Sequence, residues 1–291
     1  MNVLSLFDGM SCGQLALKKA GINVDNYYSS EIDKYAIKVT QSNFPKTIQL
    51  GDINAWEGWN LPKIDLILAG SPCQGFSFAG KQLNFNDPRS ALFFKFVEIL
   101  KFHKPKYFLL ENVKMKKEYE QVITDTLEVK PMLLNSSLVS AQNRERLYWF
   151  NWEVKPPKDK NLQISNVYQA NTGKPLTEKT ANRPRTLRNL RHHDQKAFCM
   201  LATMYKLAQT NGMTVIQDGK YLRCITPLEC ERLQTVPDNY TNHASNTQRY
   251  KMLGNGWTVE MVAHILKGVK DAKKETQEKI IDESVRLYEG E

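Results

Sequence analysis

The first half of the chain alternates short apolar runs with longer segments of helical periodicity. The apolar runs predict seven buried strands: Asn2 to Phe7, Tyr27 to Ser30, Ile48 to Leu50, Ile64 to Ala69, Tyr107 to Leu110, Met132 to Ser137 and Arg146 to Phe150. Helices are expected between them, after Gly13, from Asp33 to Asn43, from about Arg89 to Phe102 and from Lys116 to Leu127. This alternation predicts an α/β fold with a doubly wound, mostly parallel sheet.

The pattern changes at Trp152. Residues 153–222 are rich in Lys, Pro, Asn, Thr and Arg and show weak periodicity, which indicates a separate small region. We therefore predict a first domain over 1–152, the small region over 153–222, a return to the first domain over 223–272, and a charged, helical tail over 273–291.

Helix-start signals mark the segment 223–272, where the chain is predicted to return to the first domain. Thr226-Pro227-Leu228-Glu229 is a Ser/Thr-x-x-Glu capping box with Pro at the first helical position, and its helix should end by Pro237. A second candidate box begins at Ser245, and Gly254 suits a left-handed helix end. Apolar positions from Val259 to Val269 predict a last helix that packs beside the first strand.

The charge is unevenly distributed. The formal net charge is +9, from 40 Lys and Arg against 31 Asp and Glu. Between Glu153 and Lys220 there are 12 Lys and Arg and only 5 Asp and Glu, so most of the excess lies in the small region. This distribution favours a polyanionic partner such as nucleic acid; a solvated basic surface is the alternative.

Cysteine usage indicates a reducing compartment. The cysteines are odd in number and form no C-x-x-C pair, so neither a disulfide framework nor a metal site is expected. They are Cys12, Cys73, Cys199, Cys224 and Cys230. Because the chain starts on a strand with no signal-peptide pattern, and has no apolar run that could span a bilayer, we expect a cytoplasmic protein without membrane contact.

Cys73 is the strongest candidate for chemistry. It follows the apolar run Ile64 to Ala69, and the carboxyl ends of strands in α/β sheets are where ligands bind. A thiol in that position suits a nucleophile; a structural cysteine is the alternative. Two later motifs favour the nucleophile: Glu111-Asn112-Val113 at the end of the next strand, and Gln142-Asn143-Arg144-Glu145-Arg146 at the start of the last one.

Pro72-Cys73-Gln74, Glu111-Asn112-Val113 and Gln142-x-Arg144-x-Arg146, in this order, resemble the signature of the DNA (cytosine-5) methyltransferases. The resemblance runs from Phe7 to about Leu266, with a gap between about Glu153 and Leu222. Phe7-Asp8-Gly9 and Gly254-Asn255-Gly256-Trp257 resemble the eukaryotic de novo enzymes and their phage and bacterial relatives most. The family resemblance implies a class I, Rossmann-like S-adenosylmethionine-dependent methyltransferase fold, with a small target recognition domain in the gap.

The resemblance implies transfer of a methyl group from S-adenosylmethionine to carbon 5 of cytosine in double-stranded DNA, by base flipping and a covalent Cys73 adduct. Thiolate addition to carbon 6 makes carbon 5 nucleophilic, which divides one hard step into easier ones. Glu111 would bind the base and offset charge, unless it only forms an ordinary ion pair with Arg144 or Arg146. The two arginines alternate, so they are expected to face the same side of one strand. By resemblance, these four residues are catalytic.

The first turn and the second strand end are the expected cofactor site. An acid at the tip of the second strand, Glu31, can accept both ribose hydroxyls, although it could equally serve as a helix-start acid. The resemblance implies that the cofactor is held by Phe7, Asp8, Gly9, Ser11, Gly13, Glu31, Ile32, Asp52, Ile53, Pro72, Asn255, Gly256 and Trp257. Here the glycines read F-D-G-x-x-x-G in place of the common F-x-G-x-G, and Gly256 stands where many members have Ser or Ala.

Double-stranded DNA is the expected partner, and the resemblance is compatible with a companion restriction nuclease. A lid is expected between Gly75 and Pro88, with a plain connector as the alternative. The expected DNA contacts are Ser77, Lys81, Gln82, Arg183, Arg185, Arg188 and Arg191. Two alternatives stay open: a transfer-RNA cytosine-5 methyltransferase, whose shorter insertion is not seen here, and a catalytically inactive DNA-binding module, which the intact motif residues argue against.

Overall fold

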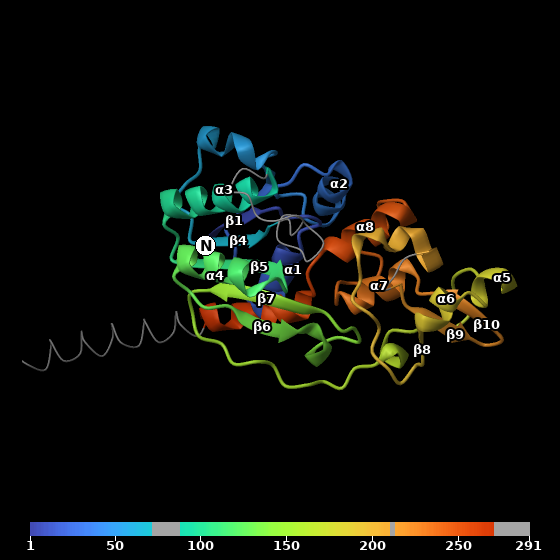
Figure 1. The fold of residues 1–291 in the computed structure, drawn as a ribbon. Helices are drawn as coiled ribbons and strands as arrows, with labels where there is room; N and C mark the ends of the chain where they lie inside the picture. The colour runs from blue at the N-terminus through green and yellow to red at the C-terminus, as the bar shows by residue number, and fades with distance from the viewer. Residues whose placement is uncertain (72–87, 210–212, 271–291) are drawn as a thin grey trace, which may run out of the picture.

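The computed structural model describes residues 1–71, 88–209 and 213–270. A seven-stranded sheet with helices on both faces forms one lobe, and a smaller lobe built around three short strands lies beside it (Figure 1). The α/β class predicted from the alternating pattern is therefore confirmed.

The large sheet has the strand order β3-β2-β1-β4-β5-β7-β6. Its strands are β1 (Asn2–Leu6), β2 (Asn26–Ser30), β3 (Ile48–Gln49), β4 (Leu66–Gly70), β5 (Tyr107–Val113), β6 (Met132–Asn135) and β7 (Glu145–Phe150). The helices of this lobe include α1 (Cys12–Ala20), α2 (Lys34–Asn43), η1 (Ile53–Gly58), α3 (Pro88–His103) and α4 (Lys117–Leu127). Strands β3, β2, β1, β4 and β5 pair in parallel, whereas β7 is antiparallel to both β5 and β6.

The reversal at β7 has a local cause. Between β6 and β7 the chain forms only η3 (Ser136–Leu138), which is too short for the crossover that a parallel connection needs. The side-chain Oδ1 of Asn135 accepts hydrogen bonds from the backbone N–H groups of Ser137 at 3.0 Å and Arg144 at 2.9 Å. One asparagine thus holds both ends of the short connection.

Both faces of the large sheet are buried. Along β4, Leu66 and Leu68 belong to one apolar core with α1 and the helix over 259–270, whereas Ile67 and Ala69 belong to a second core with α3. This is the alternation that a strand covered on both faces requires. The sheet is therefore a support covered on both faces, and the polar side chains of the motifs lie at the ends of its strands.

The small lobe holds a sheet of order β10-β9-β8, made of β8 (Leu190–Arg191), β9 (Val215–Asp218) and β10 (Tyr221–Cys224). Around it lie η4 (Ile164–Asn166), α5 (Glu178–Ala181), α6 (Pro184–Arg188), η5 (Ala202–Gln209), α7 (Pro227–Leu233) and α8 (Asn246–Asn255). Its apolar residues join the core on one face of the large sheet, so the two lobes share a core.

A buried ion network fixes the small lobe. Arg223 is fully buried and pairs with Asp218 at 2.6 Å and Glu229 at 2.8 Å. Although burial opposes the charged form, the hydrogen bond from Arg223 lowers the pKa of Asp218 to about 2. Glu229 also accepts from the backbone N–H of Thr226, and Thr226 accepts from that of Glu229, so the first predicted capping box is confirmed.

The second predicted box is wrong. Ser245 precedes α8, but its side chain makes no capping hydrogen bond with any residue that the structure describes. Gly254 does not end the helix in a left-handed conformation either, because it lies inside α8. A glycine is needed at position 254 for another reason: a Cβ there would lie 2.2 Å from the carbonyl carbon of Leu201.

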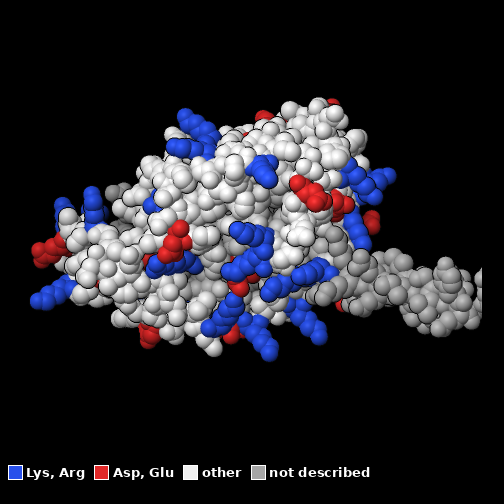
Figure 2. Space-filling view, turned by 180° about the vertical axis from the view of Figure 1, so that it is seen from behind, with Lys and Arg blue, Asp and Glu red and all other residues white. Residues whose placement is uncertain are grey.

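Basic side chains are widely distributed over the surface. On the face seen in Figure 2, Lys and Arg outnumber Asp and Glu and gather near the lower middle of the molecule. No helix of the described ranges combines the length and the apolar character needed to cross a bilayer.

Candidate active site

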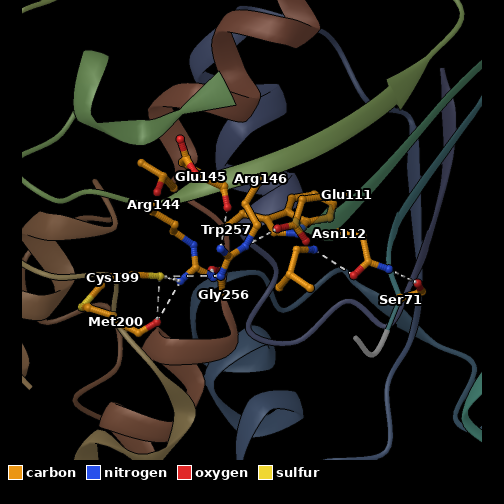
Figure 3. A network of polar contacts seen from close by, with 12 residues as sticks. Ser71, Glu111, Asn112, Arg144, Glu145, Arg146, Cys199, Met200, Gly256 and Trp257 are labelled. Carbon is orange, nitrogen blue, oxygen red and sulfur yellow. Dashed lines mark hydrogen bonds and ion pairs between the residues drawn. The ribbon is translucent and has the colours of Figure 1, made fainter. Parts of the chain in front are cut away.

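The ends of β4 and β5 and the start of β7 bring two of the expected catalytic residues, Glu111 and Arg146, together. In the sheet, Gly70 at the end of β4 pairs with Glu111 on β5, and Val113 pairs with Arg146 on β7. Glu111 is buried, with 7% of its surface exposed. Figure 3 shows its side chain between those of Arg146 and Trp257.

Both carboxylate oxygens of Glu111 have a donor. Arg146 Nε lies 2.9 Å from Oε1, and Trp257 Nε1 donates to Oε2 at 3.1 Å. Burial works against the charged guanidinium, but the nearby Glu111 carboxylate raises the pKa of Arg146. The ion pair that the sequence offered as an alternative role for Glu111 is therefore present, and it also orients the carboxylate.

Arg144 contacts backbone carbonyls and not the Glu111 carboxylate. It precedes β7 and donates from Nη1 to the Met200 carbonyl at 2.9 Å and from Nη2 to the Gly256 carbonyl at 2.8 Å. Burial, with a smaller effect of Arg146, lowers the pKa of Arg144. The guanidinium thus joins three segments that are distant in sequence, and of the two motif arginines it is Arg146 that pairs with Glu111.

Asn112 connects this group to the end of β4. Its side-chain amide donates to Ser71 Oγ at 3.0 Å, and its Oδ1 accepts from the backbone N–H of Val113. Ser71 is the last residue that the structure describes before residue 88. Five expected site residues lie outside the described residues: Pro72, Cys73, Ser77, Lys81 and Gln82.

Cys199 is a site neighbour that sequence reasoning did not identify. Its sulfur lies 3.6 Å from Arg144 Nη1 and 3.8 Å from Arg146 Nη2. Cys199 lies there because Ala197 forms an isolated parallel bridge with Gln142: Ala197 donates to the carbonyl of residue 141 and accepts from the N–H of residue 143. Since 53 residues separate Cys199 from Arg146, no local pattern indicates this contact.

The turn from β1 to α1 has an unusual backbone. Phe7, Gly9 and Ser11 all have positive φ, at 57°, 59° and 59°, a conformation that costs energy for the two that are not glycine. Glu31 accepts the Gly9 N–H on Oε2 at 2.8 Å and the N–H groups of the next two residues on Oε1. The acid at the tip of β2 therefore ties β2 to this turn.

Asp8 and Gly13, two residues expected in the cofactor site, make close contacts within the protein. Asp8 accepts hydrogen bonds from four hydroxyl groups, of Ser5, Ser11, Tyr27 and Ser29, and burial raises its pKa. Gly13 has no room for a side chain, because a Cβ would lie 2.7 Å from Tyr27 Oη. The Asp8 carboxylate therefore organises the turn through these hydroxyl groups, and Gly13 lets α1 pack closely against Tyr27.

Open space and an exposed apolar side chain lie on the outer side of this turn. A Cβ added at Gly9 or Gly51 would meet no described atom within 4 Å. Ile32, at the tip of β2, is 73% exposed. Asp52 caps η1 through a hydrogen bond from the Asn54 N–H at 2.9 Å, and Ile53 is buried below it. A flat apolar ring beside Ile32 and a polyhydroxyl group beside Glu31 fit this surface.

The comparison with known families decides what kind of site this is. A family model of C-5 cytosine-specific DNA methylases matches residues 1–197 and 158–271. The chain belongs to this family. It is a DNA (cytosine-5) methyltransferase, as the three motifs indicated.

Individual relatives agree. The methyltransferase is 31% identical to Type II methyltransferase M1.ScrFI of Lactococcus lactis subsp. cremoris, over 89% of this chain and 75% of that protein. It is 30% identical to Type II methyltransferase M.NlaX of Neisseria lactamica, over 93% of this chain and 96% of that one. The structure of S. pombe Dnmt2, 20% identical, matches with a TM-score of 0.75 over 92% of this chain and 97% of that one, and this likeness shows the fold alone.

The expected DNA-contacting arginines of the methyltransferase lie in the small lobe. Arg183, Arg185 and Arg188 are exposed on or next to α6, and the Arg191 guanidinium stacks 3.7 Å from the ring centre of Phe198. Helix α6 packs against η5. These two elements also expose large apolar side chains that sequence reasoning did not single out: Leu187, Tyr205 and Leu207.

Proposed function

We propose that this methyltransferase transfers a methyl group from S-adenosylmethionine to carbon 5 of a flipped-out cytosine in duplex DNA, through a covalent adduct with Cys73. The observation that supports this most is the buried Glu111, whose carboxylate is oriented from two sides near the end of β5; the following residue, Asn112, donates to Ser71. Cys73 follows Ser71 by two residues in the chain.

Glu111 is placed to recognise the base. A carboxylate offers about four lone-pair sites, and Arg146 and Trp257 use two of them. A remaining site can accept a hydrogen from the amino group of cytosine. In its protonated form the Glu111 carboxyl can donate to ring nitrogen 3, and this proton offsets the negative charge that builds up when the Cys73 thiolate adds to carbon 6. Carbon 5 then gains nucleophilic character and forms the bond to the methyl group. Loss of the carbon 5 proton, with release of the Cys73 thiolate, then restores the ring as 5-methylcytosine.

The turn after β1 fits S-adenosylmethionine. Glu31 would hold the ribose hydroxyls, Ile32 and Ile53 with Asp52 would lie around the adenine, and the backbone at Gly9 would meet the methionine part. Asn255, Gly256 and Trp257 would close the site from the other side. When bound, the cofactor supplies an electrophilic methyl carbon on a sulfonium.

Duplex DNA is the proposed polymer. The target carbon lies inside the base stack, so the base must leave it at a cost of a few kcal/mol. Arg183, Arg185, Arg188 and Arg191 of the small lobe, with Ser77, Lys81 and Gln82, would supply compensating contacts. The Type II names of the relatives support a restriction-modification context with a partner nuclease. The transfer-RNA alternative keeps the same site and changes only the polymer.

Bisulfite sequencing of DNA from cells that express the protein tests reaction and polymer together. The proposal predicts 5-methylcytosine at one recurrent sequence, absent from cells that express Cys73→Ala. In parallel, purified protein should transfer tritiated methyl groups to duplex DNA in preference to bulk transfer RNA. Preference for transfer RNA would mean that the substrate is transfer RNA and not duplex DNA. No transfer to any polymer would refute the proposal.

A further inference from the structure

The indole of Trp257 lies between the cofactor turn and Glu111. Its Nε1 donates to Glu111 Oε2 at 3.1 Å, and the ring covers Gly70, where an added Cβ would lie 2.9 Å from Nε1 and 3.2 Å from Cζ2. The far edge of the ring reaches α1, where Cζ3 is 3.8 Å from a Cβ added at Gly13. One side chain thus borders both halves of the site.

We propose that Trp257 is a positioning residue: its indole N–H fixes the carboxylate plane of Glu111 for base recognition, independently of any contact with the cofactor. The proposal rests on the proposed function, since it needs Glu111 to bind cytosine. It gives Trp257 a role that its expected place in the cofactor site does not include.

The surroundings explain why two donors are needed. Arg146 pairs with Oε1 through Nε, while its Nη1 donates to the Glu145 carbonyl and its Nη2 lies near the Cys199 sulfur. A contact at one oxygen leaves the carboxylate free to turn about it. The indole adds a second donor on Oε2, so the two remaining acceptor directions are set before a base arrives. Such fixed orientation matters because misplacement of a recognition group by a fraction of an ångström lowers the rate.

The indole itself cannot turn away easily. Gly70 pairs in register with Glu111, so the strand pair that carries the carboxylate also supports the ring that donates to it. A side chain at position 70 would occupy the place of the indole. The Trp257 backbone is held as well, because Arg144 and Gln234 both donate to the carbonyl of Gly256, at 2.8 and 2.9 Å.

Trp257→Phe separates the hydrogen bond from the packing, since it keeps an aromatic ring and removes the donor. We expect single-turnover methyl transfer to duplex DNA to slow by about 10- to 100-fold, which is what loss of one hydrogen bond to a charged group produces. Binding of S-adenosylhomocysteine should stay within about twofold. Trp56→Phe is the matched control, because its indole N–H has no partner among the described residues.

A double-mutant cycle identifies the route of the effect. Glu111→Asp keeps the charge but withdraws the carboxylate from the indole by one methylene. If Trp257 acts through Glu111, Trp257→Phe should slow the Glu111→Asp enzyme by less than about threefold. Equal slowing in both backgrounds, or loss of cofactor binding that accounts for the rate, would overturn the inference.

The controls separate this inference from the proposed function. Wild type that transfers no methyl group to DNA would refute the function itself. Active wild type whose rate Trp257→Phe leaves unchanged would refute only the role of the indole. Thermal unfolding of each variant shows whether a slower rate reflects a loss of folded protein.

Discussion

At the scale of single residues, the thiols separate into two groups. Cys12, Cys224 and Cys230 are buried, and desolvation raises the pKa of the Cys12 and Cys224 thiols to about 12 and that of Cys230 well above its ordinary value. Such thiols make poor nucleophiles, because the thiolate is the reactive form. Cys199, beside two arginines, is therefore the described cysteine that competes with Cys73 for the role.

Substitution of each thiol decides between them. Cys73→Ala should abolish methyl transfer while S-adenosylhomocysteine binding stays within a few fold, because the thiol serves the base. Cys199→Ala should retain activity within about threefold, as expected of a side chain near the site that does no chemistry. Tritiated methyl transfer to duplex DNA measures the activity of both variants. If Cys199→Ala were inactive and Cys73→Ala active, Cys199 would be the nucleophile in place of Cys73.

Glu31 allows a second prediction at this scale. Glu31→Ala should weaken S-adenosylhomocysteine binding by about 1 to 3 kcal/mol, because a charged acceptor for two hydroxyls and the anchor of the Gly9 N–H are both lost. Calorimetric titration measures this, with the exposed Glu57→Ala as control. Unchanged affinity would leave Glu31 with a local role at the start of α2.

At the scale of elements, the site depends on contacts between segments far apart in the chain. Arg144 joins the β6–β7 connection to the Met200 and Gly256 carbonyls, and Gly254 lets α8 touch the backbone at Leu201. Trp257, which donates to Glu111, lies two residues after the end of α8. The position of the Glu111 carboxylate therefore depends on how closely α8 packs.

Gly254→Ala tests this packing. The new Cβ would lie 2.2 to 2.4 Å from backbone atoms of Leu201 and Ala202, so the segments must separate. We expect a loss of about 1 to 3 kcal/mol in the free energy of unfolding, together with reduced methyl transfer. Gly58→Ala, where a Cβ meets no described atom within 4 Å, should change stability by less than about 0.5 kcal/mol. Chemical denaturation of both variants compares them directly.

The elements that local signals define were predictable. The apolar runs predicted β4 and β5, and the capping box at Thr226 predicted where α7 begins. Ser245 failed as a box, because whether a side chain caps depends on its rotamer and its competitors. The antiparallel β7, the hydrogen bonds of Asp8 and the contact of Cys199 with Arg146 depend on tertiary pairing, and no residue spacing contains that information.

At the scale of the whole molecule, the arrangement is a rigid sheet whose strand ends carry the chemistry, beside a basic lobe. The arginines around α6 are exposed there, and the small lobe shares a core with the large one, so its surface is held in place relative to Glu111. Charge on this lobe should therefore act on DNA affinity and leave the chemical step alone.

Salt dependence measures that contribution. Replacing Arg183, Arg185 and Arg188 by Ala should flatten the log–log dependence of DNA affinity on salt by about 2 to 3, since each phosphate contact contributes about 0.9. Replacing Lys63, Lys101 and Lys106, exposed where β4 and β5 begin and not where they end, should leave the slope unchanged. Equal slopes for the two triple variants would show that α6 does not clamp phosphates.

The central claim is that Cys73 forms a bond to the target cytosine of duplex DNA. In duplex DNA synthesised with 5-fluorodeoxycytidine in place of deoxycytidine, every cytosine carries fluorine where the carbon 5 proton would be. Fluorine cannot leave as a proton does, so the thiolate is not eliminated and the adduct persists. With S-adenosylmethionine present, wild type should form a denaturant-stable complex, and peptide mass spectrometry should place the nucleotide on Cys73. An adduct on Cys199, or no adduct from protein that methylates ordinary duplex DNA, would contradict the account.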